Sequence, residues 1–262
     1  MRYAEYAPSP AFAPVVDCYW ILEGHGTGLP EPIIPDGRLE IIFHYGVRFD
    51  RHHLDGTAER QPASMIVGQL LAPISVGYHG NAGVAAIRLR PAAARAVLGA
   101  SAAEITNRFV DLEDVFAPTG TLRERLALAA GDGDRVGLLD AWLRGVVRTA
   151  PGRETDRAAR AITASGGTAN LLGVASAAGI SLRQLERRFL ADVGIPPKTF
   201  ARLVRLQAAL RGIADGRPLA DVAHACGYYD QPHMTRDFSR LAATSPAAWQ
   251  QHSGNLTALF IR

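Results

Sequence analysis

The spacing of hydrophobic positions changes near Pro91 and divides the chain into two parts. Upstream, the apolar residues form short runs that are rich in β-branched and aromatic side chains and bounded by Gly, Pro and Asp, which predicts strands. The expected strands are Asp17–Leu22, Arg38–Tyr45, Ser64–Gly68, Ile74–Tyr78 and Val84–Leu89. Turn residues at 35–37 and 81–83 favour hairpins, and the glycine-rich residues 24–28 are expected to form a plain loop. A small sandwich or partial barrel follows.

From Pro91 onward the apolar positions recur at helical spacing. The first expected helix, Pro91–Leu98, has proline in its first turn and Gly99 just beyond its end. Ser101 with Glu104 three residues later predicts a capping box, and helical spacing continues over residues 122–130 and 136–147. The stretch 149–153 contains Pro and Gly and is the best candidate for a linker.

These patterns predict an α+β multidomain protein with three segments. Residues 1–150 form a β-rich sensory or dimerisation domain, a sandwich or partial barrel with trailing helices. Residues 151–254 form an all-α domain, and residues 255–262 form a tail.

One pattern occurs twice in the helical part. Residues 174–189 and 222–238 both begin Val-Ala-x-x-x-Gly and continue with a capping residue. In both, an apolar residue is then followed by Arg two places on and by Phe two places beyond the Arg. A helix that ends at Gly, a tight turn and a second polar helix form a helix–turn–helix, which places a helix in the major groove of DNA. The chain is therefore expected to carry two all-helical DNA-reading units.

The first unit has predicted caps at Asn170 and Ser181, and Gln184 completes a capping box with Ser181. The apolar positions of its second helix point into a core, so the polar positions near the helix start are left outside. These outward positions are Arg183, Gln184, Glu186 and Arg187. The start of a recognition helix is the part that reaches base edges, so these four are candidate DNA contacts.

The second unit has a turn that is one residue longer, with Asp230 as the predicted cap. Gln231, His233 and Arg236 are expected to project outward, and Pro232 is tolerated in the first turn because its missing N–H has no helical partner there. A long helix over residues 197–214 separates the two units. Eighteen residues of helix span roughly 27 Å, against the ~34 Å between successive major-groove faces. Such a spacer can hold both recognition helices on one side of a duplex.

The charge distribution agrees with a DNA ligand. The 262-residue chain has a net charge of only +3, but residues 165–252 hold ten basic side chains against six acidic ones. Residues 1–164 hold 17 arginines against 19 acids. The basic excess therefore coincides with the repeated pattern, as the electrostatic footprint of a nucleic-acid site does.

Other function classes find little support. No apolar run approaches the roughly 18 residues of a membrane span, and the N-terminus has no signal-peptide pattern, so we expect a cytoplasmic protein without a membrane partner. Cys18 and Cys226 have no metal-ligand spacing, and none of the common catalytic motifs occurs. We therefore expect no metal, no cofactor and no enzymatic activity.

Residues 155–252 resemble the DNA-binding domain of AraC/XylS-family transcription regulators, most specifically at residues 225–240 and 244–249. The resemblance implies two helix–turn–helix units, RNA polymerase as a partner, and a set of base-contacting positions. These positions are Arg183, Glu186, Arg187, Gln231, Pro232, His233 and Arg236. Two of them depart from the usual pattern. Glu186 is an acceptor suited to the N4 amine of cytosine, and Pro232 cannot hydrogen-bond a base.

The N-terminal part resembles regions fused to such domains, which implies sensing or dimerisation. Alternation along residues 39–45 places Glu40, Ile42 and His44 on one face, where Glu40 and His44, together with Arg88, could line an effector pocket. A hydrogen-bonded structural network is the alternative for the same residues. We expect a DNA-binding transcription regulator whose partners are double-stranded DNA, a small-molecule effector and a second copy of the chain. A β-fold enzyme or metal-binding module fused to the DNA-binding domain, or a purely architectural domain, remain the other interpretations.

Overall fold

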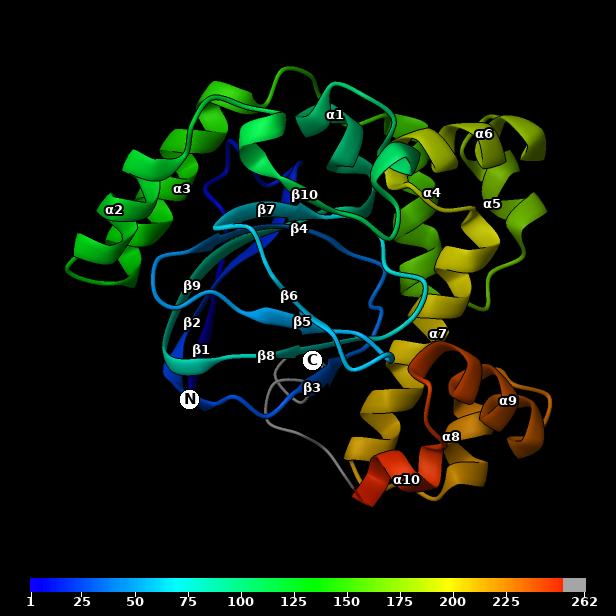
Figure 1. Cartoon of the computed structure of the whole chain (residues 1–262). Helices are drawn as coiled ribbons and strands as arrows, with labels where there is room; N and C mark the ends of the chain where they lie inside the picture. Colours follow the sequence, from blue (N-terminus) through cyan, green and yellow to red (C-terminus); the bar gives the residue numbers. More distant parts are fainter. Residues whose placement is uncertain (252–262) are drawn as a thin grey trace.

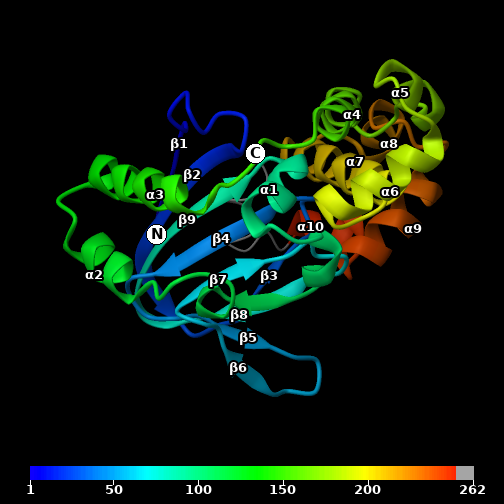
Figure 2. The same cartoon turned by 90° about the horizontal axis from the view of Figure 1, so that it is seen from above.

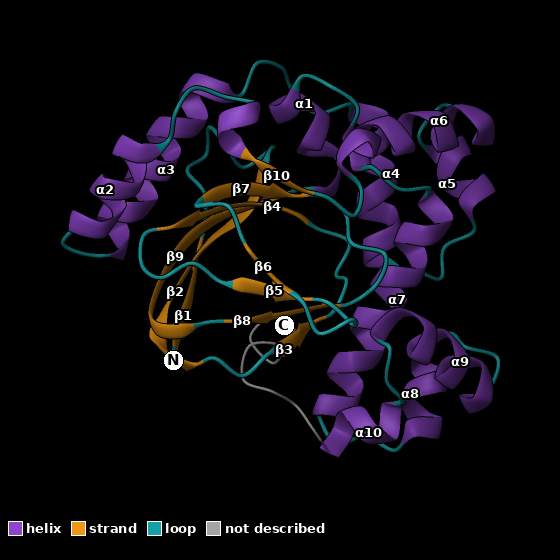
Figure 3. Cartoon of the chain, viewed as in Figure 1, coloured by secondary structure: helices purple, strands orange, loops and turns teal. Residues whose placement is uncertain are grey.

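The computed structural model describes residues 1–251 and contains two antiparallel sheets followed by a helical region (Figures 1 and 3). The larger sheet has the order β1 (Arg2–Tyr6), β2 (Val16–Thr27), β9 (His79–Leu89), β4 (Leu39–His44), β7 (Ser64–Val67) and β10 (Phe109–Asp111). The smaller sheet has the order β3 (Glu31–Ile33), β8 (Ile74–Gly77), β5 (Asp50–His52) and β6 (Ala58–Arg60). The sheets do not close into a barrel, which confirms the predicted partial barrel or sandwich.

The central strand β4 separates two environments. Its alternate residues Leu39, Ile41 and Phe43 are fully buried in the larger core of this half. Its other face carries Glu40, Ile42 and His44, which line a cavity between the two sheets. The predicted alternation is confirmed, because successive side chains of a strand point to opposite faces.

Helices cover the outer face of the larger sheet (Figure 2). The short helical elements are η1 (Pro91–Ala93), α1 (Ala94–Leu98), η2 (Ala102–Ile105) and η3 (Leu112–Asp114), followed by α2 (Gly120–Leu128) and α3 (Asp132–Val146). Leu139 and Leu143 of α3 are buried with Phe43, and the Trp142 ring meets the Phe43 ring edge-on at 5.3 Å between centroids. These contacts bury the apolar stripe predicted for residues 136–147.

Three local predictions in this half were wrong. Residues 24–27 and 81–83 are not a loop and a hairpin turn but belong to paired strands, since residues 23–27 at the end of β2 pair with residues 79–83 at the start of β9. Glycine at 26 allows this pairing, since a Cβ there would lie 2.4 Å from the Tyr78 ring. Ser101 makes no side-chain cap, so the capping box with Glu104 is absent, and only a short 3₁₀ turn forms.

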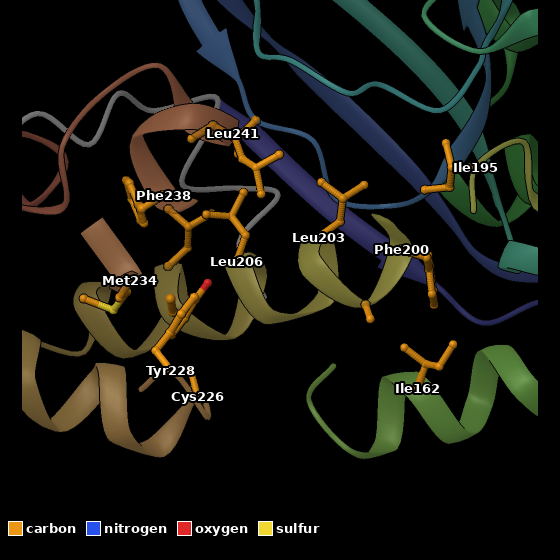
Figure 4. Packing of buried hydrophobic residues seen from close by; sticks show 14 of the residues in the cluster. Ile162, Ile195, Phe200, Leu203, Leu206, Cys226, Tyr228, Met234, Phe238 and Leu241 are labelled. Atoms are coloured by element: carbon orange, nitrogen blue, oxygen red, sulfur yellow. The ribbon is translucent and has the colours of Figure 1, made fainter. Parts of the chain in front are cut away.

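The helical half contains α4 (Arg153–Ala164), α5 (Leu171–Ala177), α6 (Leu182–Val193), α7 (Pro197–Ala214), α8 (Leu219–Ala225), α9 (Gln231–Ala242) and α10 (Pro246–Gln251). The predicted bounds of α7 are confirmed. Its apolar side chains contact helices on both sides, so one continuous core joins the two helix–turn–helix units (Figure 4). In this view Phe200 lies near Ile162 of α4, while Leu206 lies toward Phe238 of α9.

The two halves are packed against each other through the turn that follows β3. Ile34 belongs to the core of the helical half, and the Gln207 side-chain amide of α7 donates to the Pro35 carbonyl at 2.9 Å. On another side, the Thr106 hydroxyl donates to the Gly194 carbonyl at 2.7 Å. The boundary proposed at residues 150 and 151 stays a prediction, and the predicted tail 255–262 lies outside the described residues.

Replacement of Phe189 by alanine should destabilise the helical half, because its ring is fully buried against Phe200, with ring centroids 5.4 Å apart. We expect a loss of about 3–5 kcal/mol in the free energy of unfolding, measured by chemical denaturation. The neighbouring Leu190→Ala is the matched control, since Leu190 is 42% exposed and should cost far less. Equal losses in the two variants would contradict the assignment of Phe189 to the shared core.

Candidate nucleic-acid interface

The first helix–turn–helix consists of α5, a glycine turn and α6. Asn170 caps α5 by accepting from the backbone amides of Leu172 and Gly173. The turn requires a left-handed residue, and Gly179 supplies it with φ of +78°. Any residue with a Cβ atom would be strained at this positive φ. The predicted cap and turn are confirmed.

A capping box fixes the start of α6. The Ser181 hydroxyl accepts from the Gln184 amide at 3.2 Å, and the Gln184 side-chain oxygen accepts from the Ser181 amide at 2.9 Å. The predicted box is therefore confirmed. It also commits the side-chain oxygen of Gln184 to the helix start, so only the amide donor of Gln184 remains available to a ligand.

The two faces of α6 differ sharply in exposure. Leu185 and Phe189 are fully buried, whereas all four candidate contact residues on the opposite face are exposed. The adjacent Arg188 pairs with Glu154 of α4 at 3.2 Å, so this arginine supports the packing of α6. The exposed candidates are Arg183, Gln184, Glu186 and Arg187.

The second helix–turn–helix consists of α8, a longer turn and α9. Gly227 has φ of +71°, and the Asp230 carboxylate accepts from the His233 amide at 2.6 Å, which confirms the predicted cap. Gln231, Pro232 and Arg236 are exposed, whereas Met234 and Phe238 are fully buried. The outward face expected of a recognition helix is present here too.

Two aromatic residues at this turn were not singled out from the sequence. The His233 ring is half-buried and meets the Tyr228 ring edge-on, with centroids 5.4 Å apart, so packing holds part of this candidate contact residue. The adjacent Tyr229 is 93% exposed beside the start of α9. The sequence feature that could have pointed to them is the extra residue in this turn, next to two consecutive tyrosines.

An ion pair between helices fixes the orientation of α9. The Arg202 guanidinium of α7 donates to the Asp237 carboxylate with Nε to Oδ1 at 3.1 Å. Because Asp237 is largely buried, this contact ties α9 to the same long helix that packs against α6. In both Figure 1 and Figure 2, α6 and α9 lie on the side of the molecule away from α2 and α3.

The predicted effector residues do not share one cavity. Glu40 and His44 line the cavity between the sheets, whose volume is about 90 Å³. Arg88 lines a neighbouring hollow of about 370 Å³ at the junction with α7, which shares Asp36 and Arg38 with the first cavity. The Glu40 carboxylate accepts from Arg88 Nε at 2.9 Å and from Trp20 Nε1 at 3.0 Å. This is the hydrogen-bonded network that the sequence left open as the alternative.

His44 is the most perturbed histidine of the described chain. Burial lowers the pKa of His44 to about 4, against a weaker opposing effect of the Gln61 hydrogen bond. The ring is therefore neutral near pH 7. Within residues 1–251, no group of three or more His, Cys, Asp or Glu side chains could hold a metal ion, and no helix has the length and apolar character to cross a membrane.

The comparisons with known proteins fit this geometry. Residues 174–252 match a family described as a helix-turn-helix domain, and residues 4–111 match one described as a domain of unknown function (DUF6597). A putative AraC-like transcription regulator from Streptomyces antibioticus is 32% identical over 80 residues, which cover 30% of this chain and 26% of that protein. This chain thus spans about a quarter of the length of that relative.

Solved structures share the whole fold. ToxT from Vibrio cholerae aligns with a TM-score of 0.52 at 8% identity, covering 88% of this chain and 98% of ToxT. A ToxT structure bound to (E)-4-(8-methylnaphthalen-1-yl)but-3-enoic acid aligns with a TM-score of 0.50 at 7% identity, covering 96% of this chain and 99% of ToxT.

Two helix–turn–helix units that share one core, each with an exposed second helix, define a double helix–turn–helix DNA-binding domain. Residues 174–252 match the helix-turn-helix domain family, the chain is similar over 80 residues to a putative AraC-like regulator, and a DUF6597 match precedes the helix–turn–helix part.

The folding stability should fall as the pH is lowered from about 6.5 to about 4 because of His44. In that window the unfolded chain binds a proton that the folded chain excludes, and the integrated effect is roughly 3 kcal/mol. The measurement is the unfolding free energy against pH for the wild type and for His44→Gln, with His53→Gln as the exposed control. A wild-type pH dependence identical to that of His44→Gln would contradict the prediction.

Proposed function

We propose that this protein is a sequence-specific DNA-binding transcription regulator in which α6 and α9 enter successive major-groove segments. The observation that carries the proposal is the exposure of the outward faces of α6 and α9, two helices that share one core around α7 and lie on the side of the molecule away from α2 and α3 (Figures 1 and 2). The 18-residue length of α7 and the basic excess of residues 165–252 support it. The protein acts by binding, and we propose no catalytic activity for it.

Each exposed side chain has a base chemistry that it suits. Arg183, Arg187 and Arg236 can donate two hydrogen bonds to guanine, and Gln231 can pair with adenine. Glu186 accepts from the N4 amine of cytosine. Gln184 and His233 are partly held by the capping box and by Tyr228, so we assign them positioning contacts, and Pro232 contributes shape alone.

We further propose that a small molecule between the two sheets controls DNA binding; a ToxT structure of similar fold is bound to a small organic acid. The supporting feature is the turn 34–38. Ile34, Asp36 and Arg38 line the cavity, while the same turn packs on α7 through Gln207 and Phe200. A ligand that moves this turn therefore shifts the helix that carries both recognition helices.

RNA polymerase, as the family resemblance implies, and a second copy of the chain are further proposed partners. Both follow from the proposed regulatory role, which also makes the cytoplasm the proposed location.

Selection of bound fragments from a random duplex pool tests the proposal directly. We expect an enriched site with two elements about one helical turn apart, since α6 and α9 read neighbouring groove segments. A gel-shift titration of the selected site at two salt concentrations then measures affinity and its electrostatic part. No enrichment over the starting pool would overturn the proposed function.

Arg187→Ala and Arg236→Ala should each weaken binding to the selected site by about 1–3 kcal/mol and relax one base position. Each removes an exposed guanidinium from one recognition helix, so the two variants should affect different elements of the site. Competition gel shifts with point-substituted duplexes provide the measurement. Arg144→Ala is the charge-matched control, because Arg144 is exposed on α3, on the far side of the molecule. Unchanged selectivity in either test variant would remove that residue from the interface.

A further inference from the structure

The cavity between the sheets has the lining of a site for one aromatic ring. Its walls are mainly aliphatic and aromatic side chains, among them Trp20, Phe49 and Phe109 from different strands and loops. Its volume of about 90 Å³ far exceeds the ~10–15 Å³ that a water needs and is of the same order as the roughly 150 Å³ cavity that binds benzene. A ligand with a single ring and few substituents matches this space.

One buried polar atom in the cavity wall lacks a hydrogen-bond partner among the described residues. His44 is 2% exposed, and its Nδ1 atom has no hydrogen-bond partner among residues 1–251. The other ring nitrogen, Nε2, lies 3.2 Å from the Gln61 side-chain oxygen. An amide oxygen can only accept, so the ring proton sits on Nε2 and Nδ1 is left as a bare acceptor. A buried acceptor without a donor is costly, and a ligand with a donor removes that cost.

The charged groups of the cavity do not favour an ionised ligand. Glu40 already accepts from Arg88 and Trp20, and Arg38 pairs with Asp17 at 3.0 Å. The burial that keeps the His44 ring neutral also leaves it without a charge to balance a carboxylate. A carboxylate oxygen placed at Nδ1 would meet the ring lone pair rather than a proton.

Building on the proposed effector control, we propose that this cavity binds a small uncharged aromatic molecule with one hydrogen-bond donor, of which phenol is the simplest example. The hydroxyl donates to His44 Nδ1 and the ring packs among the apolar side chains. The assignment follows from the size of the cavity, its aromatic lining and its one unpartnered acceptor.

Calorimetric titration of the full-length wild-type protein with phenol, toluene and benzoate tests the ligand class. The three probes share a ring and differ in donor and charge. We expect phenol to bind about tenfold more tightly than toluene, because only phenol satisfies Nδ1, and more tightly than benzoate. Equal affinity for phenol and toluene, a preference for benzoate, or no binding of any probe would overturn the assignment.

Two further measurements assign the effect to His44. His44→Phe should reduce the preference for phenol over toluene to near onefold, whereas His53→Phe, on the exposed hairpin between β5 and β6, should leave it unchanged. In the wild type, the ¹⁵N chemical shift of His44 Nδ1 should move on addition of phenol and stay constant with toluene. This second readout needs no variant to fold, and an unmoved Nδ1 signal in phenol-saturated protein would overturn the proposal.

The titrations contain no DNA, and the duplex selection contains no ligand. A failure of phenol to bind is therefore distinguishable from a failure of the proposed DNA-binding function.

Discussion

Burial of α7 along its whole length is the constraint on which the DNA-binding arrangement depends. Phe200 near its start packs against Phe189 of the first unit, and Leu206 lies toward Phe238 of the second within the same buried core (Figure 4). Because interiors are close-packed, neither unit can rotate about this helix without opening a void. The spacing and facing of the recognition helices are therefore properties of one core rather than of a flexible linker.

The same helix connects DNA reading to the β-rich half. Gln207 is buried and bonds to the Pro35 carbonyl, and a Cβ at Gly37 would lie 3.1 Å from the Phe200 ring. The turn is thus held closely against α7, and its residues Ile34, Asp36 and Arg38 also line the cavity between the sheets. A few residues of backbone separate the proposed ligand from the helix that positions both recognition helices.

Some buried polar groups in the β-rich half have hydrogen-bond partners in the described chain, and others do not. Glu40 and Arg88 face each other across neighbouring strands and form an ion pair, which is the expected state of buried charge. His44, four residues beyond Glu40 on the same face of β4, keeps an acceptor without a partner in the described part of the chain. Strand β4 therefore carries both Glu40, which belongs to a structural ion-pair network, and His44, which supplies the acceptor in the proposed binding cavity.

Much of the helical half could be predicted from the sequence because its signals are local. The caps at Asn170, Ser181 and Asp230, the turn at Gly179 and the full extent of α7 depend on residues within a few positions of each other. The exposed candidate contacts followed from helical periodicity. By contrast, the adjoining ends of β2 and β9 are rich in glycine, which is typical of loops, and they are strands only because they pair with each other. The short strands β3, β5, β6 and β10 escaped detection because three residues hold too little pattern.

The amino-acid sequence by itself determined the two helix–turn–helix units, their caps and the alternation of β4, since each depends on backbone geometry repeated over neighbouring residues. Tertiary structure alone decided that Arg88 lies outside the cavity that Glu40 and His44 share, and that the turn 34–38 meets α7. These outcomes join segments up to 172 positions apart, and contacts at such separations are set by how whole layers pack.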